Sequence, residues 1–317
     1  MLMFKHQIVA TMTSFKSFVD VAIDKEQIKL AELQPRKIGI FKCGNIGTAP
    51  NLELLLDELA DRKDIKVRVV TSGSKMNPED VEEALPKLFA FNPDIVVMIS
   101  PNTALPGPSK AREAIANAKL PGIVITDAPG KKVKADIEQQ GLGYLIITAD
   151  PLIGARKEFL DPIEMAVFNS NVNKVLAITG VYRIVYQEID KVIYAVEAGQ
   201  TPALPKMVID ICMMREQPFF ANPYAKAKAI AAYAMLEKVA EIDTQACFIE
   251  KESEKYLPLT ASSHEIAQAA ARLAEEAREI EKYNDTVLRK PHGKDGKLKI
   301  KTKLLMPATT EVQPGNI

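Results

Sequence analysis

Short runs of β-branched and aliphatic residues alternate with amphipathic stretches from Lys37 to about Asp150. This alternation is typical of βαβ units built around a parallel sheet. The predicted strands are residues 37–43, 67–70, 94–100, 122–127 and 143–148. Helices are predicted over 49–62 and over 77–91, the second of which begins at Asn77-Pro78.

Beyond Asp150 the apolar residues recur mostly at helical spacing. One or two long helices are predicted over 161–199, and further helices over 223–241 and 264–288. Residues 298–305 alternate apolar residues with lysines after a turn-like segment, which predicts a strand or hairpin with one face in water. We therefore expect an α/β fold: a Rossmann-like parallel-sheet domain with an added helical bundle and a short C-terminal β segment.

These changes of pattern divide the chain into four predicted parts. The parts are an N-terminal extension of unknown role (1–35), an α/β ligand-binding domain (36–155), a helical region (156–290), and a C-terminal β hairpin and tail (291–317). The extension has no clear link to the pattern that follows it, and Met12 is an alternative start of the chain.

The composition is that of a globular protein, since the 317 residues are 47% hydrophobic and 26% charged. The 41 Lys and Arg residues balance the 41 Asp and Glu residues, which disfavours binding to nucleic acid or to an anionic membrane surface. No run reaches the roughly 18 apolar residues of a membrane span, and the N-terminus is a poor signal peptide, so we expect a cytoplasmic protein. The three cysteines and three histidines are too scattered for a disulfide framework or a zinc site, which favours a metal-free mechanism.

Ligands of an open parallel sheet bind beyond the carboxyl ends of its strands, so the loops at those ends are the first places to look. A G-x-x-G turn follows the first strand and runs directly into a helix. Its glycines allow close backbone approach, and the helix N-terminus favours an anionic or electron-rich group. The candidate ligand-binding residues of this turn are Gly44, Asn45, Ile46, Gly47 and Thr48.

This turn is not a standard NAD site. It lacks the full G-x-G-x-x-G spacing, and the second strand ends in Thr71-Ser72-Gly73-Ser74 where an NAD site usually has an acidic residue. Thr71, Ser74 and Lys75 can accept a 2′-phosphate, so an NADP-linked reductase stays open as an alternative.

The loop after the third strand contains three prolines and one glycine within eight residues, which fix its backbone and lower the entropy cost of holding a ligand. Its candidate ligand-binding residues are Pro101, Asn102, Pro106, Gly107, Ser109 and Lys110, the last for an anionic group. The alternative is a stiff connector in which Ser109 caps the following helix.

A second rigid turn, Asp127-Ala128-Pro129-Gly130, follows the fourth strand. It places a carboxylate at the strand end. Asp127 is either a cap or turn-forming residue or a carboxylate at the reacting centre.

Two basic segments lie outside the predicted sheet. In residues 154–162, Arg156-Lys157 precedes a helix start at Asp161-Pro162, and this segment is either ligand-binding or a solvated turn. The C-terminal part is rich in Lys, Arg and His, and forms either a solvated edge or a site for polyanionic ligand tails. Its basic residues are Arg289, Lys290, His292, Lys294 and Lys297.

The catalytic motifs of hydrolases and phosphoryl-transfer enzymes are missing. The sequence has no nucleophile elbow, no P-loop, no H-E-x-x-H and no convincing pair of carboxylates. Rigid, glycine-containing loops without an obvious nucleophile suit a reaction whose chemistry resides in two ligands, such as hydride transfer.

Several segments carry a resemblance to a known family. They are KCGNIGT (42–48), PNTALPGPSKARE (101–113), DAPGKKVK (127–134), QGLGY (140–144), GARKEFLDP (154–162), NPYAKAKAIAA (222–232), TASSHE (260–265) and NDTVLRKPHGKDGK (284–297). In this order they resemble the coenzyme F-420-dependent methylenetetrahydromethanopterin dehydrogenases of methanogenic archaea, from about Lys37 to Met306.

The resemblance implies reversible hydride transfer between methylenetetrahydromethanopterin and the 5-deazaflavin coenzyme F-420, giving methenyltetrahydromethanopterin and reduced F-420 in methanogenesis from carbon dioxide. It also implies a homohexamer, a trimer of dimers, with no metal and no flavin. Coenzyme F-420, as a cosubstrate, is expected at the candidate ligand-binding residues of the loops after the first and third strands. It is also expected at Ser72, Ala128 and Pro129. A non-catalytic oligomerisation protein built on a degenerate sheet is the remaining alternative.

On the pterin side, three residues are candidates. Asp127 is expected to stabilise the cation that develops as the hydride leaves. Arg156 and His264 are expected to bind the substrate. Because His264 follows a pair of serines at the head of a predicted helix, helix capping is the alternative for this histidine.

Overall fold

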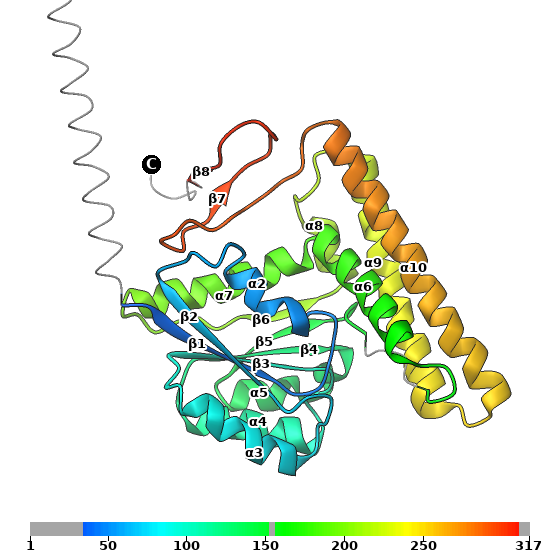
Figure 1. The fold of residues 1–317 in the computed structure, drawn as a ribbon, viewed down its shortest axis with the longest axis horizontal. Coiled ribbons are helices and arrows are strands. Elements are labelled where there is room, and N and C mark those ends of the chain that lie inside the picture. The colour runs from blue at the N-terminus through cyan, green and yellow to red at the C-terminus, as the bar shows by residue number, and fades with distance from the viewer. Residues whose placement is uncertain (1–33, 152–155, 311–317) are drawn as a thin grey trace, which may run out of the picture.

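The structure is a computed structural model that describes residues 34–151 and 156–310 (Figure 1). The predicted N-terminal extension, apart from its last two residues, lies outside the described residues, as does the pair Gly154-Ala155. Within the described ranges, none of the helices combines the length and the apolarity that crossing a bilayer demands.

A six-stranded parallel sheet forms the centre of the fold, with the strand order β2-β1-β3-β4-β5-β6. The strands are β1 (Arg36–Lys42), β2 (Ile65–Thr71), β3 (Ile95–Ser100), β4 (Gly122–Asp127), β5 (Gly143–Ile147) and β6 (Lys206–Ile209). All five predicted strands are present. Every residue of β3, β4 and β5 is buried, as their continuous apolar runs predict.

Strand β6 was not predicted. It lies in the region expected to be helical and pairs in parallel with β5 at the edge of the sheet. Of its four residues only Ile209 is buried. A short edge strand with one open side needs no continuous apolar run, and the sequence therefore carries little signal for it.

Helices cover both faces of the sheet (Figure 1). One face carries α3 (Pro78–Phe89), α4 (Pro106–Asn117) and α5 (Lys134–Gln139), and the other carries the 3-10 turn η1 (Ala49–Asn51), α2 (Leu52–Leu56) and α7 (Val181–Glu197). Side chains of β1 alternate between the two layers: Phe41 packs with α3 and α4, whereas Ile38 and Ile40 pack with α2 and α7. The predicted start of α3 is confirmed, because Asn77 Oδ1 accepts a hydrogen bond from the Asp80 amide at 2.9 Å.

The helix predicted over 49–62 is shorter than expected, since α2 ends at Leu56. Asp57 Oδ1 then accepts hydrogen bonds from the amides of Asp61 (3.0 Å) and Arg62 (3.3 Å), which turns the chain. This turn directs the Arg62 side chain into the interior, where only 1% of it is exposed. The chain therefore turns at Asp57 instead of continuing the helix, and Arg62 forms buried ion pairs with Asp64 and Asp190.

The helical part of the chain lies beside the sheet (Figure 1). Its elements are α6 (Pro162–Thr179), α8 (Ile211–Glu216), α9 (Pro223–Thr244), the π-helical turn η3 (Gln245–Ile249) and α10 (Ser253–Tyr283). Helices α9 and α10 pack side by side, and α6 packs against both. The stretch predicted as one or two helices over 161–199 is two, because Gly180 ends α6 with a left-handed φ of 100°.

Residues 284–310 form a C-terminal arm over the α2 and α7 side of the sheet (Figure 1). The arm contains the two-residue strands β7 (Lys299–Ile300) and β8 (Thr309–Thr310), which pair antiparallel. The expected C-terminal β hairpin is therefore present, although its strands are shorter than predicted.

Candidate functional site

The strand order places a topological switch point between β1 and β3. The chain leaves β1 towards β2 on one side and returns to β3 on the other. Ligands of doubly wound sheets bind in the crevice that opens at such a point, beyond the carboxyl ends of the strands. The loops after β1 and β3 flank this crevice, and the sequence predicted both as ligand-binding.

Three loops pack against one another around Gly44, which has a left-handed φ of 82°. A Cβ atom at this position would lie 2.7 Å from Met76 Sδ and 3.0 Å from Pro101 Cδ. The Gly44 amide donates a hydrogen bond to the Gly73 carbonyl at 3.0 Å. The loops after β1, β2 and β3 are thus one closely packed unit, and only glycine fits at its centre.

Gly107 closes the same unit from the N-terminus of α4. A Cβ atom there would lie 2.4 Å from the Met76 carbonyl oxygen and 2.6 Å from that of Asn77. The Gly107 position therefore depends on close backbone approach, which the sequence predicted for the turn after β1 and not for this loop. Pro106 and Pro108 flank Gly107 within the first turn of α4 and hold that turn rigid.

The three packed loops carry neutral polar side chains that form hydrogen bonds within them. Asn45 is exposed, and its Nδ2 donates to Ser74 Oγ at 2.9 Å. Ser72 Oγ donates to the Lys75 carbonyl at 2.8 Å, and Asn102 Oδ1 accepts from the Ala104 amide at 3.1 Å. These groups shape the loops.

An open approach to the loops lies at Gly73. It has a left-handed φ of 69°. Apart from Gly73 and its two chain neighbours, the described residues have no atom within 4 Å of the position that its Cβ would take. Amide and hydroxyl groups beside an open backbone turn fit a polar heterocyclic ligand with a phosphate, which is the chemistry of coenzyme F-420.

Three predicted contact residues have other surroundings than expected. Ser109 lies in the first turn of α4 and does not cap it, because Leu105 is the N-cap residue. Lys110 is exposed and pairs with Glu82 of α3, so its charge is directed towards that helix. The side chain of Ile46 is only 1% exposed and belongs to the core, which leaves its backbone for a ligand.

Asp127 stands at the end of β4, where 4% of it is exposed. Its Oδ1 accepts a hydrogen bond from the Ala128 amide at 2.5 Å, so it caps the 3-10 turn η2 (Ala128–Val133). Ala128 and Pro129 begin this turn and are half-buried. The predicted capping role of Asp127 is confirmed. Capping also fixes the carboxylate at the carboxyl end of β4. A role of Asp127 in the reaction stays a prediction.

Sequence reasoning missed Asp150, which follows β5 by three residues. Its Oδ2 accepts hydrogen bonds from Thr48 Oγ1 at 2.5 Å and from the Thr48 amide at 3.1 Å. Asp150 is fully buried, and burial raises the pKa of its carboxyl group to about 6. A signal was available, because Asp150 stands just after a predicted strand, as Asp127 does.

Arg156 is held by the helical part of the chain. Its guanidinium donates to the carbonyls of Ala246 (2.8 Å) and Glu250 (2.5 Å) at the end of η3, and it lies 4.0 Å from the centre of the Tyr256 ring. These contacts satisfy carbonyls that the end of a helix leaves open. The solvated turn considered for this segment is therefore wrong for Arg156 itself.

His264 does not cap a helix. Helix α10 begins at Ser253, so His264 lies inside it, and the expected helix start at 264 is wrong. The imidazole packs against the rings of Phe159 and Phe168, with centroids 4.9 and 4.5 Å away. Its Nδ1 lies 3.6 Å from Glu164 Oε2. The preceding Ser263 donates to Asp243 at 2.5 Å, so this hydroxyl pairs across the α9–α10 hairpin.

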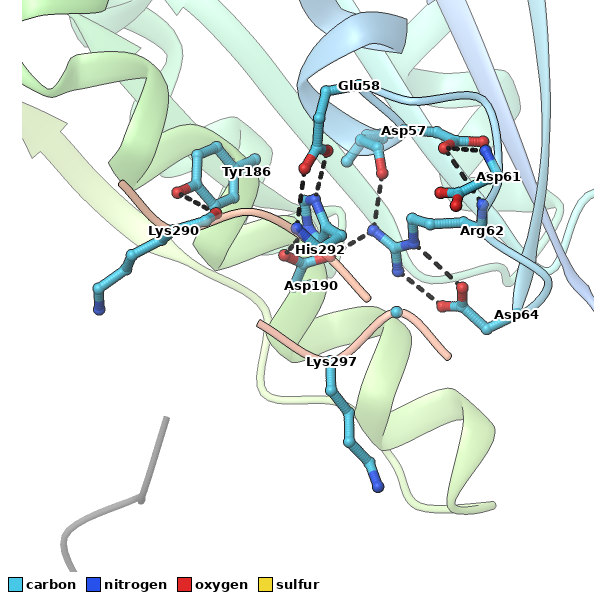
Figure 2. Close-up of polar contacts among 12 residues, drawn as sticks. Asp57, Glu58, Asp61, Arg62, Asp64, Tyr186, Asp190, Lys290, His292 and Lys297 are labelled. Atoms are coloured by element: carbon cyan, nitrogen blue, oxygen red, sulfur yellow. Dashed lines mark hydrogen bonds and ion pairs between the residues drawn. The ribbon is translucent and has the colours of Figure 1, made fainter. Parts of the chain in front are cut away.

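The basic C-terminal residues do not form one exposed patch. His292 is buried between Glu58 and Asp190, with each ring nitrogen 2.8 Å from a carboxylate oxygen (Figure 2). Lys290 and Lys297 extend away from this cluster in Figure 2. A solvated edge is therefore wrong for His292, which instead ties the C-terminal arm to the sheet domain.

The structure thus brings together the predicted loops after β1 and β3 with the loop after β2. Asp127 stands on the same edge, since β4 pairs directly with β3. Arg156 and His264 are anchored in the helical part, and the contacts described for them are made there.

Comparison with known proteins identifies the family of the chain. A family model described as methylene-5,6,7,8-tetrahydromethanopterin dehydrogenase matches residues 36–309. The chain is 58% identical to the F-420-dependent methylenetetrahydromethanopterin dehydrogenase of Methanothermobacter thermautotrophicus over 269 residues, 85% of this chain and 98% of that protein. It is 57% identical to the enzyme of the same description from Archaeoglobus fulgidus, over 85% of this chain and 97% of that protein.

A solved structure shows the same fold. It is described as F-420-dependent methylene-tetrahydromethanopterin dehydrogenase in complex with methylene-tetrahydromethanopterin and coenzyme F-420. The TM-score is 0.85 at 47% identity, and the match covers 87% of this chain and all of that one. The family model spans most of the chain and the relatives share more than half of its aligned residues, so the chain belongs to the methylene-5,6,7,8-tetrahydromethanopterin dehydrogenase family.

Proposed function

We propose that this protein catalyses reversible hydride transfer between methylenetetrahydromethanopterin and coenzyme F-420, giving methenyltetrahydromethanopterin and reduced F-420, as a step of methanogenesis from carbon dioxide. One observation carries the proposal beyond family membership. Glycine- and proline-stiffened loops converge at the β1/β3 switch point, around Gly44 and Gly107. Bound F-420 supplies a ring that accepts the hydride. The protein's task is to hold two ligands in register and to keep water out.

On the F-420 side, the Gly44-to-Thr48 turn and the side chains of Asn45, Ser72 and Asn102 bind the coenzyme. The amides of Gly44 and Thr48 already donate to the Gly73 carbonyl and to the Asp150 carboxylate, so these two residues shape the turn. The rigid loop of Pro101, Pro106 and Gly107, with Ser109 and Lys110 in the following turn, sets its pose. Ala128 and Pro129, at the start of the turn after β4, form the remaining part of the proposed F-420 site. Close glycine packing supports these assignments, because it fixes the amide positions before a ligand arrives.

On the pterin side, Asp127 stabilises the positive charge that develops as the hydride leaves the methylene carbon. The Asp127 carboxylate is buried and is fixed by the hydrogen bond from the Ala128 amide. Water screens a buried charge less than a solvated one, so its electrostatic attraction for a nearby cation is stronger. Arg156 and His264 bind the pterin substrate from the helical side. No proton transfer is required of any of these residues.

The proposed assembly is a cytoplasmic homohexamer, arranged as a trimer of dimers. Large apolar side chains on the surface support self-association, because exposed apolar patches on a folded chain mark contact surfaces. Leu304, Leu305 and Met306 of the C-terminal arm are 60%, 95% and 61% exposed. Light scattering on the purified full-length chain tests the assembly, and a monomer at micromolar concentration would contradict it.

The activity test is an anaerobic mixture of purified protein, oxidised F-420 and methylenetetrahydromethanopterin, followed by the visible absorbance of the deazaflavin. A parallel cuvette contains NADP in place of F-420. Bleaching with F-420 alone is expected. Reduction of NADP instead would favour the NADP-linked alternative, and no reaction with either acceptor from a folded oligomer would contradict the proposal.

A further inference from the structure

Asp150 joins two loops that the sheet keeps apart. β1 and β5 are separated by β3 and β4 in the strand order. Even so, the Asp150 carboxylate after β5 accepts both the hydroxyl and the amide of Thr48 in the turn after β1. The turn therefore reaches across the carboxyl edge of the sheet, and one carboxylate oxygen holds its end.

The second oxygen of this carboxylate is placed under the same turn. A Cβ atom at Gly47 would lie 2.7 Å from Asp150 Oδ1, and equally close to Val172 Cγ1 of α6. Oδ1 is buried and makes no hydrogen bond of standard geometry among the residues that the structure describes, although the nearby Gly47 amide lowers the pKa of the carboxyl group. A buried carboxylate with one unsatisfied oxygen weakens the fold, so its presence needs a reason other than stability.

We propose that Asp150 is a positioning residue for the hydride-transfer reaction: its carboxylate holds the Gly44-to-Thr48 turn in the conformation that receives coenzyme F-420. The inference rests on the proposed function. Asp150 does not itself touch the ligand. It bonds Thr48, which fixes the end of the Gly44-to-Thr48 turn. The rest of the turn, which lines the crevice, is held in place as a result.

The electrostatics fit a role in function. Burial raises the pKa of the Asp150 carboxyl group to about 6, so the charged form is present at neutral pH only against the preference of its surroundings. Removal of the charge should therefore leave the fold as stable as before or more stable, while the turn is held less tightly, because a neutral amide oxygen accepts weaker hydrogen bonds than a carboxylate does. A purely structural carboxylate would show the opposite, a loss of stability with binding unchanged in the molecules that fold.

The test compares four variants of the full-length protein with the natural sequence: Asp150→Asn, Thr48→Val, the double variant, and Asp243→Asn. Asp243 is a matched control, because it is also a buried carboxylate with one oxygen bonded to a hydroxyl (Ser263) and one unsatisfied. It lies in α9, within the helical part. Calorimetric titration gives the Kd of F-420, the assay gives KM and kcat, and thermal unfolding at pH 8 gives the Tm.

Asp150→Asn is expected to weaken F-420 binding about tenfold, the order expected for a charged hydrogen bond. The KM for F-420 should rise in parallel, with kcat and Tm retained. Because Asp150 acts through Thr48, the double variant should bind hardly less tightly than Asp150→Asn alone. Asp243→Asn should leave the Kd of F-420 unchanged.

An unchanged Kd in Asp150→Asn would overturn the inference, as would additive losses in the double variant or an equal loss in Asp243→Asn. If Asp150→Asn does not fold, Thr48→Val decides alone. It keeps the amide bond at 3.1 Å and removes the shorter hydroxyl bond at 2.5 Å, and an unchanged Kd there would overturn the inference. These outcomes presuppose that the natural sequence binds F-420. A natural sequence that neither binds nor reduces F-420 would overturn the proposed function itself, and the inference with it.

Discussion

His292 in the C-terminal arm donates a hydrogen bond to Asp190 of α7, with 2.8 Å between Nε2 and Oδ2 and almost no exposure of either side chain (Figure 2). Glu58 accepts from the other ring nitrogen at 2.8 Å. Burial lowers the pKa of His292, but the hydrogen bonds to Asp190 and Glu58 outweigh it and raise that pKa to about 9. The arm is therefore fastened by a histidine that carries a positive charge at neutral pH.

This charge makes stability depend on pH. The pKa of His292 lies above the ordinary 6.5, so its stabilisation is complete below that value and is lost as the pH rises through about 9. The loss should be on the order of 2 kcal/mol. His292→Gln should lower the free energy of unfolding at pH 6.5 and flatten its fall between pH 7 and 9.5. Urea unfolding at each pH measures this, and parallel curves for the two proteins would contradict it.

Removal of Arg62 should be more damaging. Its guanidinium bonds Asp64 at 2.6 and 3.0 Å and Asp190 at 3.0 Å, with every side chain about 1% exposed. Arg62→Ala leaves Asp64 buried without its cation and leaves Asp190 with His292 as its one charged partner among the described residues, which should cost about 3–5 kcal/mol. Arg68 is the control: it is exposed, and its guanidinium lies 5.5 Å from the Phe91 ring. Arg68→Ala should cost less than about 1 kcal/mol in the same urea titration, and equal losses would refute the assignment.

Two glycines form a matched pair for the loop packing. Gly44 and Gly73 both have left-handed φ, but a Cβ at Gly44 would lie 2.7 Å from Met76 Sδ, whereas Gly73 faces open space. Gly73→Ala should therefore cost only the backbone strain, about 1 kcal/mol. Gly44→Ala should cost more and weaken F-420 binding severalfold, because the turn must move. Equal losses in the free energy of unfolding for the two variants would show that the contacts of Gly44 with Met76 and Pro101 do not constrain the turn.

Asp127→Asn tests the proposed electrostatic role. The amide oxygen of Asn can still accept from the Ala128 amide, so the η2 turn should persist. The charge is lost, so turnover should fall about 100-fold or more, the order seen when a charge-stabilising group is removed. The Kd of F-420 should change little. Unchanged turnover would remove Asp127 from the mechanism.

The sequence predicted what local patterns encode. The apolar runs of β3, β4 and β5 and the Asn77 cap are determined by near neighbours, and the structure has them. Glycine and proline likewise marked the loops that pack together around Gly44. These features needed no knowledge of distant contacts.

Features that depend on distant partners escaped prediction. Arg62 ends α2 early because its partner Asp190 lies on α7, 128 positions away in sequence. The carboxylate of Asp150 accepts from Thr48, 102 positions away in sequence. His264 was placed at a helix start because the serines before it resemble a cap, although Ser263 bonds across to Asp243. Spacing within one segment cannot reveal such pairings.

The late position of β6 in the chain bears on how the protein folds as it is synthesised. Strand β5 ends at Ile147, but its edge partner begins only at Lys206, after α6 and α7. Until the ribosome has released Ile209, the nascent chain exposes the unpaired edge of β5, a template for wrong pairing with other chains. The local contacts of α6 and α7 form faster than this distant pairing. These helices are therefore expected to be folded before β6 pairs with β5.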